Sequence, residues 1–330
     1  MKKNNRLFIP VLGIAMFLLL SACGNTDSEV EENNNEEKTK LKVVTTFYPM
    51  YDFTKNIVQD NAEVSMLIPA GTEPHGFEPS AKVVAAIQEA DVFIYNSEEM
   101  ETWVPSTLEA IDTKKVTVIN ASEGIEFIKN TEIEEHAEEG NEHAEEGNEH
   151  AEEEHEHAID PHVWLDPVLA QAEVNNIQTG LAKADKENAV IYKENASEYN
   201  QKLMNLDQEF KATFENAENR TFITQHAAFA YLAERYNLTQ ISISGLSPEL
   251  EPSPAKLAEL SKYAEKNNVR YIYFENNASS KIAETLASEA NLELAVLDPA
   301  AGVSQKEQDA GTDYVQVMKN NLESLKKSIQ

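Results

Sequence analysis

Hydrophobic positions change their spacing repeatedly after residue 40. Short runs rich in β-branched and aromatic residues, typical of buried strands, alternate with segments whose apolar residues recur three and four positions apart, as in amphipathic helices. This alternation predicts a parallel sheet with helices on both faces. In the first half of the chain, strands are predicted at 41–48, 63–68, 91–95 and 116–119, and helices at 51–59, 81–89 and 100–111.

After Pro167 the pattern becomes strongly helical, with one helix expected over 168–184 and another over about 186–216. The second contains no Gly or Pro, and about 30 residues at ~1.5 Å each give a length of roughly 45 Å, enough to run along a whole lobe. Alternation then resumes. The predicted strands are 220–224, 240–243, 270–275 and 292–297, and the predicted helices are 227–235, 254–266, 279–290 and 309–329.

The two alternating regions predict an α/β protein of two lobes, each a parallel sheet with flanking helices, joined by a long linker helix. The expected N-terminal lobe covers 41–166, the linker helices 167–218 and the C-terminal lobe 219–330. A chain of 330 residues with 41% hydrophobic residues is long enough to bury such a core.

The N-terminus has the pattern of a secretory signal. Basic residues come first, and Leu7–Leu20 is almost wholly apolar but too short to span a bilayer comfortably, so residues 1–22 are predicted to be a signal peptide. The run ends in Leu20-Ser21-Ala22-Cys23, which resembles the bacterial lipobox, in which the cysteine is lipidated. Cys23 is the only cysteine, so an intrachain disulfide is impossible.

Residues 23–40 are predicted to form the lipidated cysteine and a flexible tether, because the segment is polar and has no core-forming pattern. No later stretch is long and apolar enough to cross a membrane. We therefore expect the mature protein to sit on the outer face of the cell membrane, held by lipid on Cys23.

Charge is spread unevenly along this chain of formal net charge -31. A His/Glu-rich segment, 132–157, repeats His-Ala-Glu-Glu-Gly-Asn-Glu and is interpreted as a solvated loop. Nucleic acid is excluded as a partner because no basic patch is visible, whereas a cationic ligand fits the acidic balance. The segment holds an auxiliary set of candidate metal-binding histidines, namely His136, His143, His150, His155 and His157.

The remaining histidines each stand beside a turn signal at the edge of a predicted element. His75 follows the second strand, His162 precedes the long helical region, and His226 follows the strand that ends at Thr224. Asp298 follows the last predicted strand. Ligands of open α/β sheets bind beyond the carboxyl ends of the strands. Three imidazoles and one carboxylate form a tetrahedral nitrogen and oxygen set that suits Zn²⁺.

Five motifs carry a resemblance to a known family. They are Val-Val-Thr-Thr-Phe-Tyr-Pro at the start, then residues 73–80, 160–167, 226–229 and 297–299. With these motifs the chain resembles the solute-binding lipoproteins of bacterial zinc and manganese ABC importers. The resemblance implies two α/β lobes bridged by a rigid helix, with a metal in the cleft between them, bound by His75, His162, His226 and Asp298. In some zinc members a water or a loop histidine replaces the acidic ligand, so that position stays open.

Zinc is favoured over manganese because manganese prefers carboxylate oxygens, and manganese-type members carry Glu where His226 stands. The resemblance predicts a monomeric receptor that captures zinc with high affinity and delivers it to the permease of an ABC importer. A manganese receptor and a zinc-dependent surface adhesin are the alternatives. An enzyme is not expected, since no His-Glu-x-x-His or Gly-x-Ser-x-Gly motif is present.

Overall fold

The structure is a computed structural model that describes residues 40–129, 159–249, 252–276 and 279–330. Lys40–Gln330 form one compact unit. Among the described helices, none has the length and apolar character needed to cross a bilayer. Cys23 and the five histidines of the 132–157 segment lie outside the described residues.

The N-terminal lobe is built on a four-stranded, all-parallel sheet in the order β2-β1-β3-β4. All four residues of β3 are buried, as expected for a central strand covered on both faces. The strands are β1 (Leu41–Thr45), β2 (Ala62–Met66), β3 (Val92–Tyr95) and β4 (Thr117–Asn120), and the helices are α1 (Tyr48–Val58), α2 (Ala81–Gln88) and α3 (Val104–Ala110).

The C-terminal lobe repeats this topology with the order β6-β5-β7-β8, again all parallel. Two parallel sheets with flanking helices confirm the predicted fold class. The strands are β5 (Thr221–Thr224), β6 (Thr239–Ser242), β7 (Tyr271–Phe274) and β8 (Glu293–Val296), and the helices are α7 (Ala230–Arg235), α8 (Pro254–Lys266), α9 (Lys281–Ala290), α10 (Gln305–Asp309) and α11 (Tyr314–Leu325).

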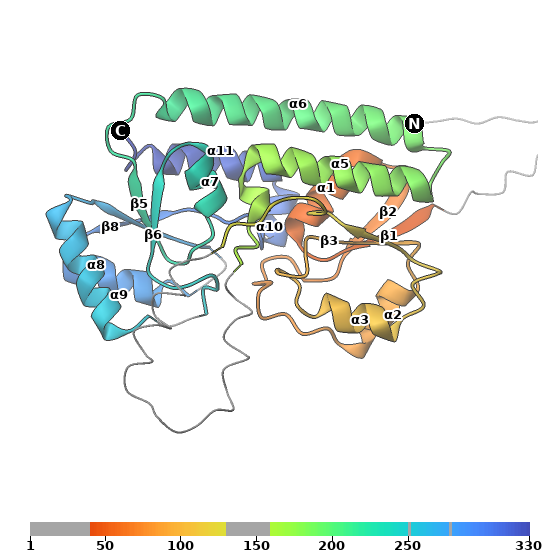
Figure 1. Cartoon of the computed structure of the whole chain (residues 1–330), viewed down its shortest axis with the longest axis horizontal. Coiled ribbons are helices and arrows are strands. Elements are labelled where there is room, and N and C mark those ends of the chain that lie inside the picture. Colours follow the sequence, from red (N-terminus) through yellow and green to blue (C-terminus); the bar gives the residue numbers. More distant parts are fainter. Residues whose placement is uncertain (1–39, 130–158, 250–251, 277–278) are drawn as a thin grey trace, which may run out of the picture. The chain divides into compact units, whose positions relative to one another are not determined.

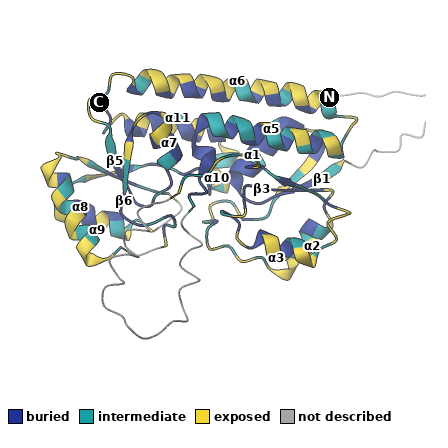
Figure 2. Ribbon diagram, viewed as in Figure 1, coloured by how far each residue is buried: buried dark blue, intermediate teal, exposed yellow. Residues whose placement is uncertain are grey.

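A short 3-10 turn, η3 (Val163–Leu165), and two helices, α5 (Pro167–Ala184) and α6 (Ala189–Phe214), connect the lobes (Figure 1). The 26 residues of α6 span ~39 Å at ~1.5 Å per residue, long enough to run along a whole lobe, as predicted. Figure 2 shows the central strand β3 buried, whereas the outer strands β2, β6 and β8 also carry exposed residues. The exact lobe boundaries stay a prediction.

Strand order reverses next to the first strand of each sheet, between β1 and β3 and between β5 and β7. Such switch points are where open α/β sheets bind ligands. In the N-terminal lobe the buried Glu101 fills this place, accepting hydrogen bonds from Thr46 Oγ1 and from the backbone N–H groups of Asn96 and Ser97. In the C-terminal lobe, His226 and Glu275 occupy the equivalent place, directly after β5 and β7.

A closing helix is present as predicted, but α11 covers only Tyr314–Leu325 of the expected range 309–329. Helix α10 ends at Asp309, and Gly311 follows with φ +85°, a left-handed conformation that breaks the helical path. Asp313 then caps α11 by accepting a hydrogen bond from the N–H of Gln316 at 2.7 Å. The predicted start is too early because Gly311 and Asp313 form a turn and a helix cap before the apolar spacing of the helix begins.

Candidate metal centre

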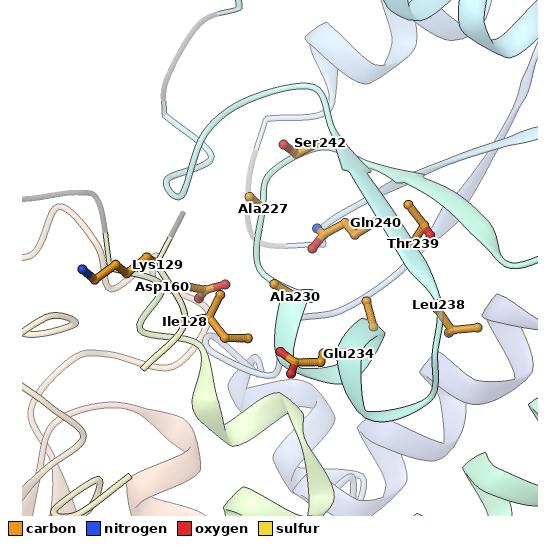
Figure 3. Close-up of a pocket in the computed structure, with 11 residues that line it drawn as sticks. Ile128, Lys129, Asp160, Ala227, Ala230, Glu234, Leu238, Thr239, Gln240 and Ser242 are labelled. Carbon is orange, nitrogen blue, oxygen red and sulfur yellow. The ribbon is translucent and has the colours of Figure 1, made fainter. Parts of the chain in front are cut away.

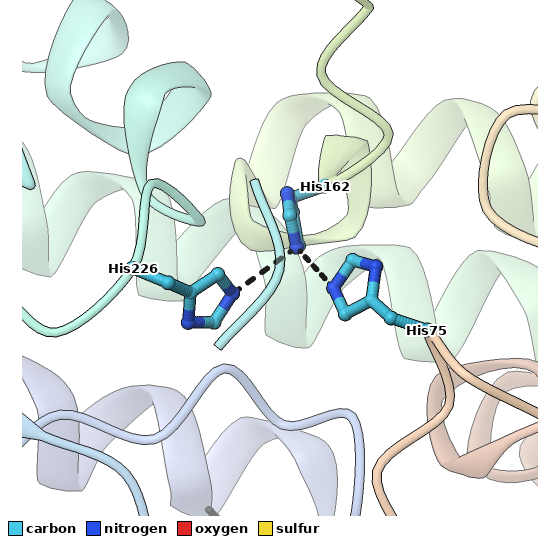
Figure 4. A group of neighbouring side chains, drawn as sticks. All are labelled: His75, His162 and His226. Carbon is cyan, nitrogen blue, oxygen red and sulfur yellow. Dashed lines mark hydrogen bonds between the residues drawn. The ribbon is translucent and has the colours of Figure 1, made fainter. Parts of the chain in front are cut away.

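Three histidines from separate connections meet at one point. His75 lies between β2 and α2, His162 immediately precedes η3, and His226 lies between β5 and α7. Nε2 of His162 is 3.0 Å from Nε2 of His75 and 3.4 Å from Nε2 of His226 (Figure 4). The structure therefore brings together the three histidines that the sequence singled out, with one ligand atom from each within 4.8 Å of the others.

Carboxylates orient two of these rings from behind. Asp160 Oδ1 lies 2.7 Å from Nδ1 of His162, and Glu275 Oε1 is hydrogen-bonded to Nδ1 of His226. Because an ionised carboxylate can only accept, each Nδ1 carries the hydrogen and each Nε2 keeps its lone pair. Two lone pairs therefore face each other across 3.4 Å, an arrangement that is repulsive unless a cation or a proton lies between them.

The spacing suits zinc. Two nitrogens bound to one zinc ion at ~2.0–2.1 Å with tetrahedral angles lie about 3.3 Å apart. The observed separations of 3.0 and 3.4 Å lie close to that value. His162 and His226 are both 1% exposed, whereas the side chain of His75 is 14% exposed, so the group opens on the side of His75.

Burial and charge act differently on the two inner histidines. Burial lowers the pKa of His162 well below its usual value, and the neighbouring His226 lowers it further, so His162 stays neutral. Burial also lowers the pKa of His226, but the charge of Glu275 and its hydrogen bond outweigh this and leave the pKa of His226 raised. Burial raises the pKa of Asp160 to about 7. In the absence of metal, a proton on His226 is thus the main competitor for the site.

Glu73 is a site residue that the sequence reasoning missed. Its Oε1 accepts the backbone N–H of His75 at 3.0 Å and lies 3.9 Å from Nε2 of the same residue. Burial raises the pKa of Glu73 to about 7. The charge of Glu275 adds to this rise, whereas the charge of His226 opposes it. Its place two residues before His75, inside the Glu-Pro-His motif, was the available signal.

Asp298 follows β8 as predicted, but it is not part of the three-histidine group among the described residues. Its Oδ1 accepts the backbone N–H of Ala300 at 2.7 Å, which turns the carboxylate toward its own loop. It borders a hollow of about 660 Å³ together with Asn276 and Glu307. A role for Asp298 as a ligand stays a prediction, as does a role for the loop histidines.

Tyr231 and Gln240 secure the connections that carry these ligands. Tyr231 Oη donates to the backbone carbonyl of Asp160 at 2.6 Å and accepts the N–H of Ile128 at 2.9 Å. Gln240 on β6 bonds to the connection that holds His226. The site thus depends on contacts between segments far apart in the chain.

Comparison with known proteins agrees with this geometry. The family profile described as "Zinc-uptake complex component A periplasmic" (ZnuA) matches residues 43–328. The chain is 49% identical over 328 residues to the high-affinity zinc uptake system protein ZnuA of Bacillus subtilis, covering 99% of this chain and 98% of that protein. It is 44% identical over 315 residues to the zinc-binding lipoprotein AdcA of Streptococcus pneumoniae, and spans only 58% of AdcA's length.

Among solved structures, the Zn(II)-bound ZnuA-like domain of Streptococcus pneumoniae AdcA superposes with a TM-score of 0.73 at 44% identity. The match covers 88% of this chain and 98% of that domain. A metal-binding relative therefore shares both the two-lobe architecture and nearly half of the residues.

Proposed function

Because the chain belongs to the family of the periplasmic zinc-uptake complex component A, we propose that it captures zinc outside the cytoplasm and delivers it to an ABC importer. Its relative along nearly the whole chain is a zinc uptake protein. Members of this family serve transport rather than catalysis, and we propose that this chain likewise catalyses no reaction.

The zinc ligands in this proposal are Nε2 of His75, His162 and His226. The observation that carries it is the 3.4 Å approach of two buried Nε2 atoms, on His162 and His226, whose rings are each held at Nδ1 by a carboxylate. Three nitrogen donors favour zinc over manganese, which prefers oxygen. Neither the manganese alternative nor the adhesin alternative has support in the geometry of the site.

The fourth coordination position faces the exposed side of the group. Glu73 stands there, with Oε1 3.9 Å from Nε2 of His75. Water, Asp298 and a histidine of the 132–157 segment remain the candidates that the sequence offers. We assign that segment an auxiliary role in collecting zinc, because it contains five histidines and many glutamates, side chains that bind zinc.

The partner in this proposal is the permease of the importer, and the receptor works as a monomer anchored by lipid on Cys23. The lipobox-like Leu20-Ser21-Ala22-Cys23 supports the anchor, and so does the name of a relative, which is a zinc-binding lipoprotein. Anchoring would keep the receptor near its importer while leaving it on the outer side of the membrane.

Growth under zinc limitation tests this function. A bacterial strain that lacks the protein, grown with a zinc chelator, is expected to recover when given the wild-type gene, and to fail when given the His162→Ala allele at equal protein level. Added zinc, but not added manganese, should rescue the failing strain. Equal growth of the two alleles would contradict the proposed function.

A further inference from the structure

Gln240 holds the connection that carries His226 at two points. Its Nε2 donates to the backbone carbonyl of His226 at 3.0 Å and to Thr224 Oγ1 at 2.6 Å. Its Oε1 accepts the backbone N–H of Phe229 at 3.0 Å. One side chain thus fixes both ends of the short segment between His226 and Phe229, outside any regular element.

The carbonyl of His226 receives a second hydrogen bond, from Thr224 Oγ1 at 2.7 Å. Thr224, in turn, accepts from Gln240, so the three groups form a closed triangle of hydrogen bonds at the carboxyl end of β5. Because every member is bonded to the other two, the direction of the His226 backbone is set from behind the metal centre.

The other interactions of His226 fix its ring rather than its backbone. Glu275 binds Nδ1 and sets the tautomer, as described above. A ring that is correctly protonated still needs a correctly placed Cα, because a metal ligand must lie within a few tenths of an ångström of its position. The Gln240 amide supplies this placement from β6, an edge strand of the sheet.

Gln240 lines a pocket of 330 Å³ that also contains Asp160, the residue that orients His162 (Figure 3). Figure 3 shows the Gln240 amide turned toward the connection that carries Ala227 and Ala230. Gln240 is only partly buried, and open space lies next to it, so its replacement does not create a cavity in a closed core. Its contribution can therefore be separated from the stability of the fold.

We propose that Gln240 is a positioning residue for zinc: its amide sets the backbone of His226, and thereby the place of Nε2 in the metal centre. This inference rests on the proposed function, because it assumes that His226 binds zinc. Gln240 itself touches no metal ligand atom and acts through the His226 carbonyl and the Phe229 N–H.

Two variants separate hydrogen bonding from packing. Gln240→Ala removes all three hydrogen bonds of the side chain. Gln240→Glu keeps the size and an acceptor for Phe229 but cannot donate to the His226 carbonyl when ionised. Thr239→Ala is the matched control, since Thr239 is exposed on the same strand and lines the same pocket. His226→Ala shows the effect of losing the ligand.

The experiment is a competition titration of the full chain in detergent with zinc and a chromophoric chelator, together with the visible spectrum of the Co²⁺-loaded protein and the urea midpoint. We expect both Gln240 variants to bind zinc about tenfold more weakly, in the range typical of groups that support metal ligands. The cobalt bands, which report ligand geometry, should shift in both variants and stay unchanged in Thr239→Ala.

Zinc affinity and cobalt bands equal to wild type in both Gln240 variants would overturn the inference, even if the urea midpoint falls, because that result describes a residue that only stabilises the fold. If His226→Ala also binds zinc as wild type does, the proposed function has failed and the inference with it. Weakened binding in His226→Ala alone would leave the proposed function standing and reject the role of Gln240.

Discussion

His226 differs from a free imidazole because Glu275 sits against its Nδ1. Burial lowers the pKa of His226, but the charge and hydrogen bond of Glu275 raise it above the ordinary value of 6.5. A proton on Nε2 blocks the lone pair that zinc needs. Protons and zinc therefore compete for Nε2 of His226.

Zinc affinity is expected to fall as the pH is lowered, and to begin falling above the pKa of a free imidazole, about 6.5. The sign follows from the raised pKa: below it, His226 is protonated and zinc must displace the proton. A chelator competition between about pH 8 and about pH 5 measures this dependence. In Glu275→Gln the fall should begin at a lower pH, and an affinity independent of pH would contradict the assignment of His226 as a ligand.

Burial has the opposite effect on Glu173 of α5, since it raises the pKa of this carboxyl. Its Oε1 accepts from Asn96 Nδ2 at 2.7 Å and from Ser122 Oγ at 3.3 Å. Its Oε2 and the Oδ1 of Asn96 are both buried without a hydrogen-bond partner in the described part of the chain. Burial raises the pKa of Glu173 well above its usual value, and the charge of Glu101 adds to this. The raised pKa favours a protonated, neutral Glu173.

Glu173→Gln is expected to keep the stability of the folded protein at neutral pH, since the amide can donate where the acid does. A carboxyl with a raised pKa contributes stability at low pH that is lost as the pH rises from the unfolded pKa, about 4.5, toward the folded one. Urea unfolding at several pH values should therefore show a smaller loss in the variant than in wild type. A drop of more than ~2 kcal/mol at neutral pH would argue that Glu173 is ionised. Glu198→Gln, at an exposed position of α6, is the control.

Helix α5 packs closely against β4 at Gly180. A Cβ placed on Gly180 would lie 2.3 Å from Cδ1 and 2.6 Å from Cγ1 of Ile119. Real Cβ atoms do not approach so closely, so the helix comes this near to the strand only because residue 180 has no side chain.

Gly180→Ala is expected to destabilise the protein by ~1–3 kcal/mol, the usual cost of overpacking. This is opposite in sign to the ~0.5–1 kcal/mol that Ala normally contributes over Gly inside a helix. Thermal unfolding measures the change. Adding Ile119→Val should recover part of the loss, and a stabilised Gly180→Ala protein would show that α5 does not pack against β4 as described.

Local sequence signals predicted elements well where caps and turns agreed with the apolar period. The helix at 254–266 was predicted with its observed bounds, because Pro254 opens it and Ser253 caps it by accepting from the N–H of Lys256 at 3.2 Å. The closing helix was predicted over 309–329 but begins only at Tyr314, because the left-handed Gly311 and the capping Asp313 precede it.

In the candidate site, too, local features could be predicted from the sequence and long-range contacts could not. The positions of the histidines at the ends of strands and before η3 could be read from turn signals and topology. Glu275 could not be paired with His226, because the two are 49 residues apart and meet only when β5 and β7 lie side by side. The same holds for Gln240, whose partners are chosen by the register of β6 against β5.

On the scale of the whole molecule, side-chain hydrogen bonds join the two lobes. Trp164 Nε1, beside His162, donates to the carbonyl of Pro299 at 2.7 Å, and Tyr48 Oη donates to the carbonyl of Thr312 at 3.1 Å. Arg235 on α7 binds Asp166, which caps α5, at 2.7 Å. Contacts between the two lobes therefore support the segments that carry the three histidines.

Deletion of residues 132–157 is expected to leave the tight zinc site intact and to remove only weaker additional sites. The three proposed ligands lie outside this segment, and an isolated β-bridge joins Lys129 to Ile159 at its base. Zinc titration of the deleted chain gives the number and strength of sites. Disappearance of the tight site would show instead that a histidine of the segment is the fourth ligand.

The central claim is that one zinc ion binds to His75, His162 and His226. Its most direct test is metal content and competitive zinc binding of the chain from residue 24 to 330, beside its His226→Ala variant. The account predicts about one tightly bound zinc per chain, with affinity reduced in the variant by more than the ~10–100-fold typical of supporting residues. Several weakly bound zinc ions, unchanged in the variant, would contradict it and leave the 132–157 segment as the zinc-binding part of the chain.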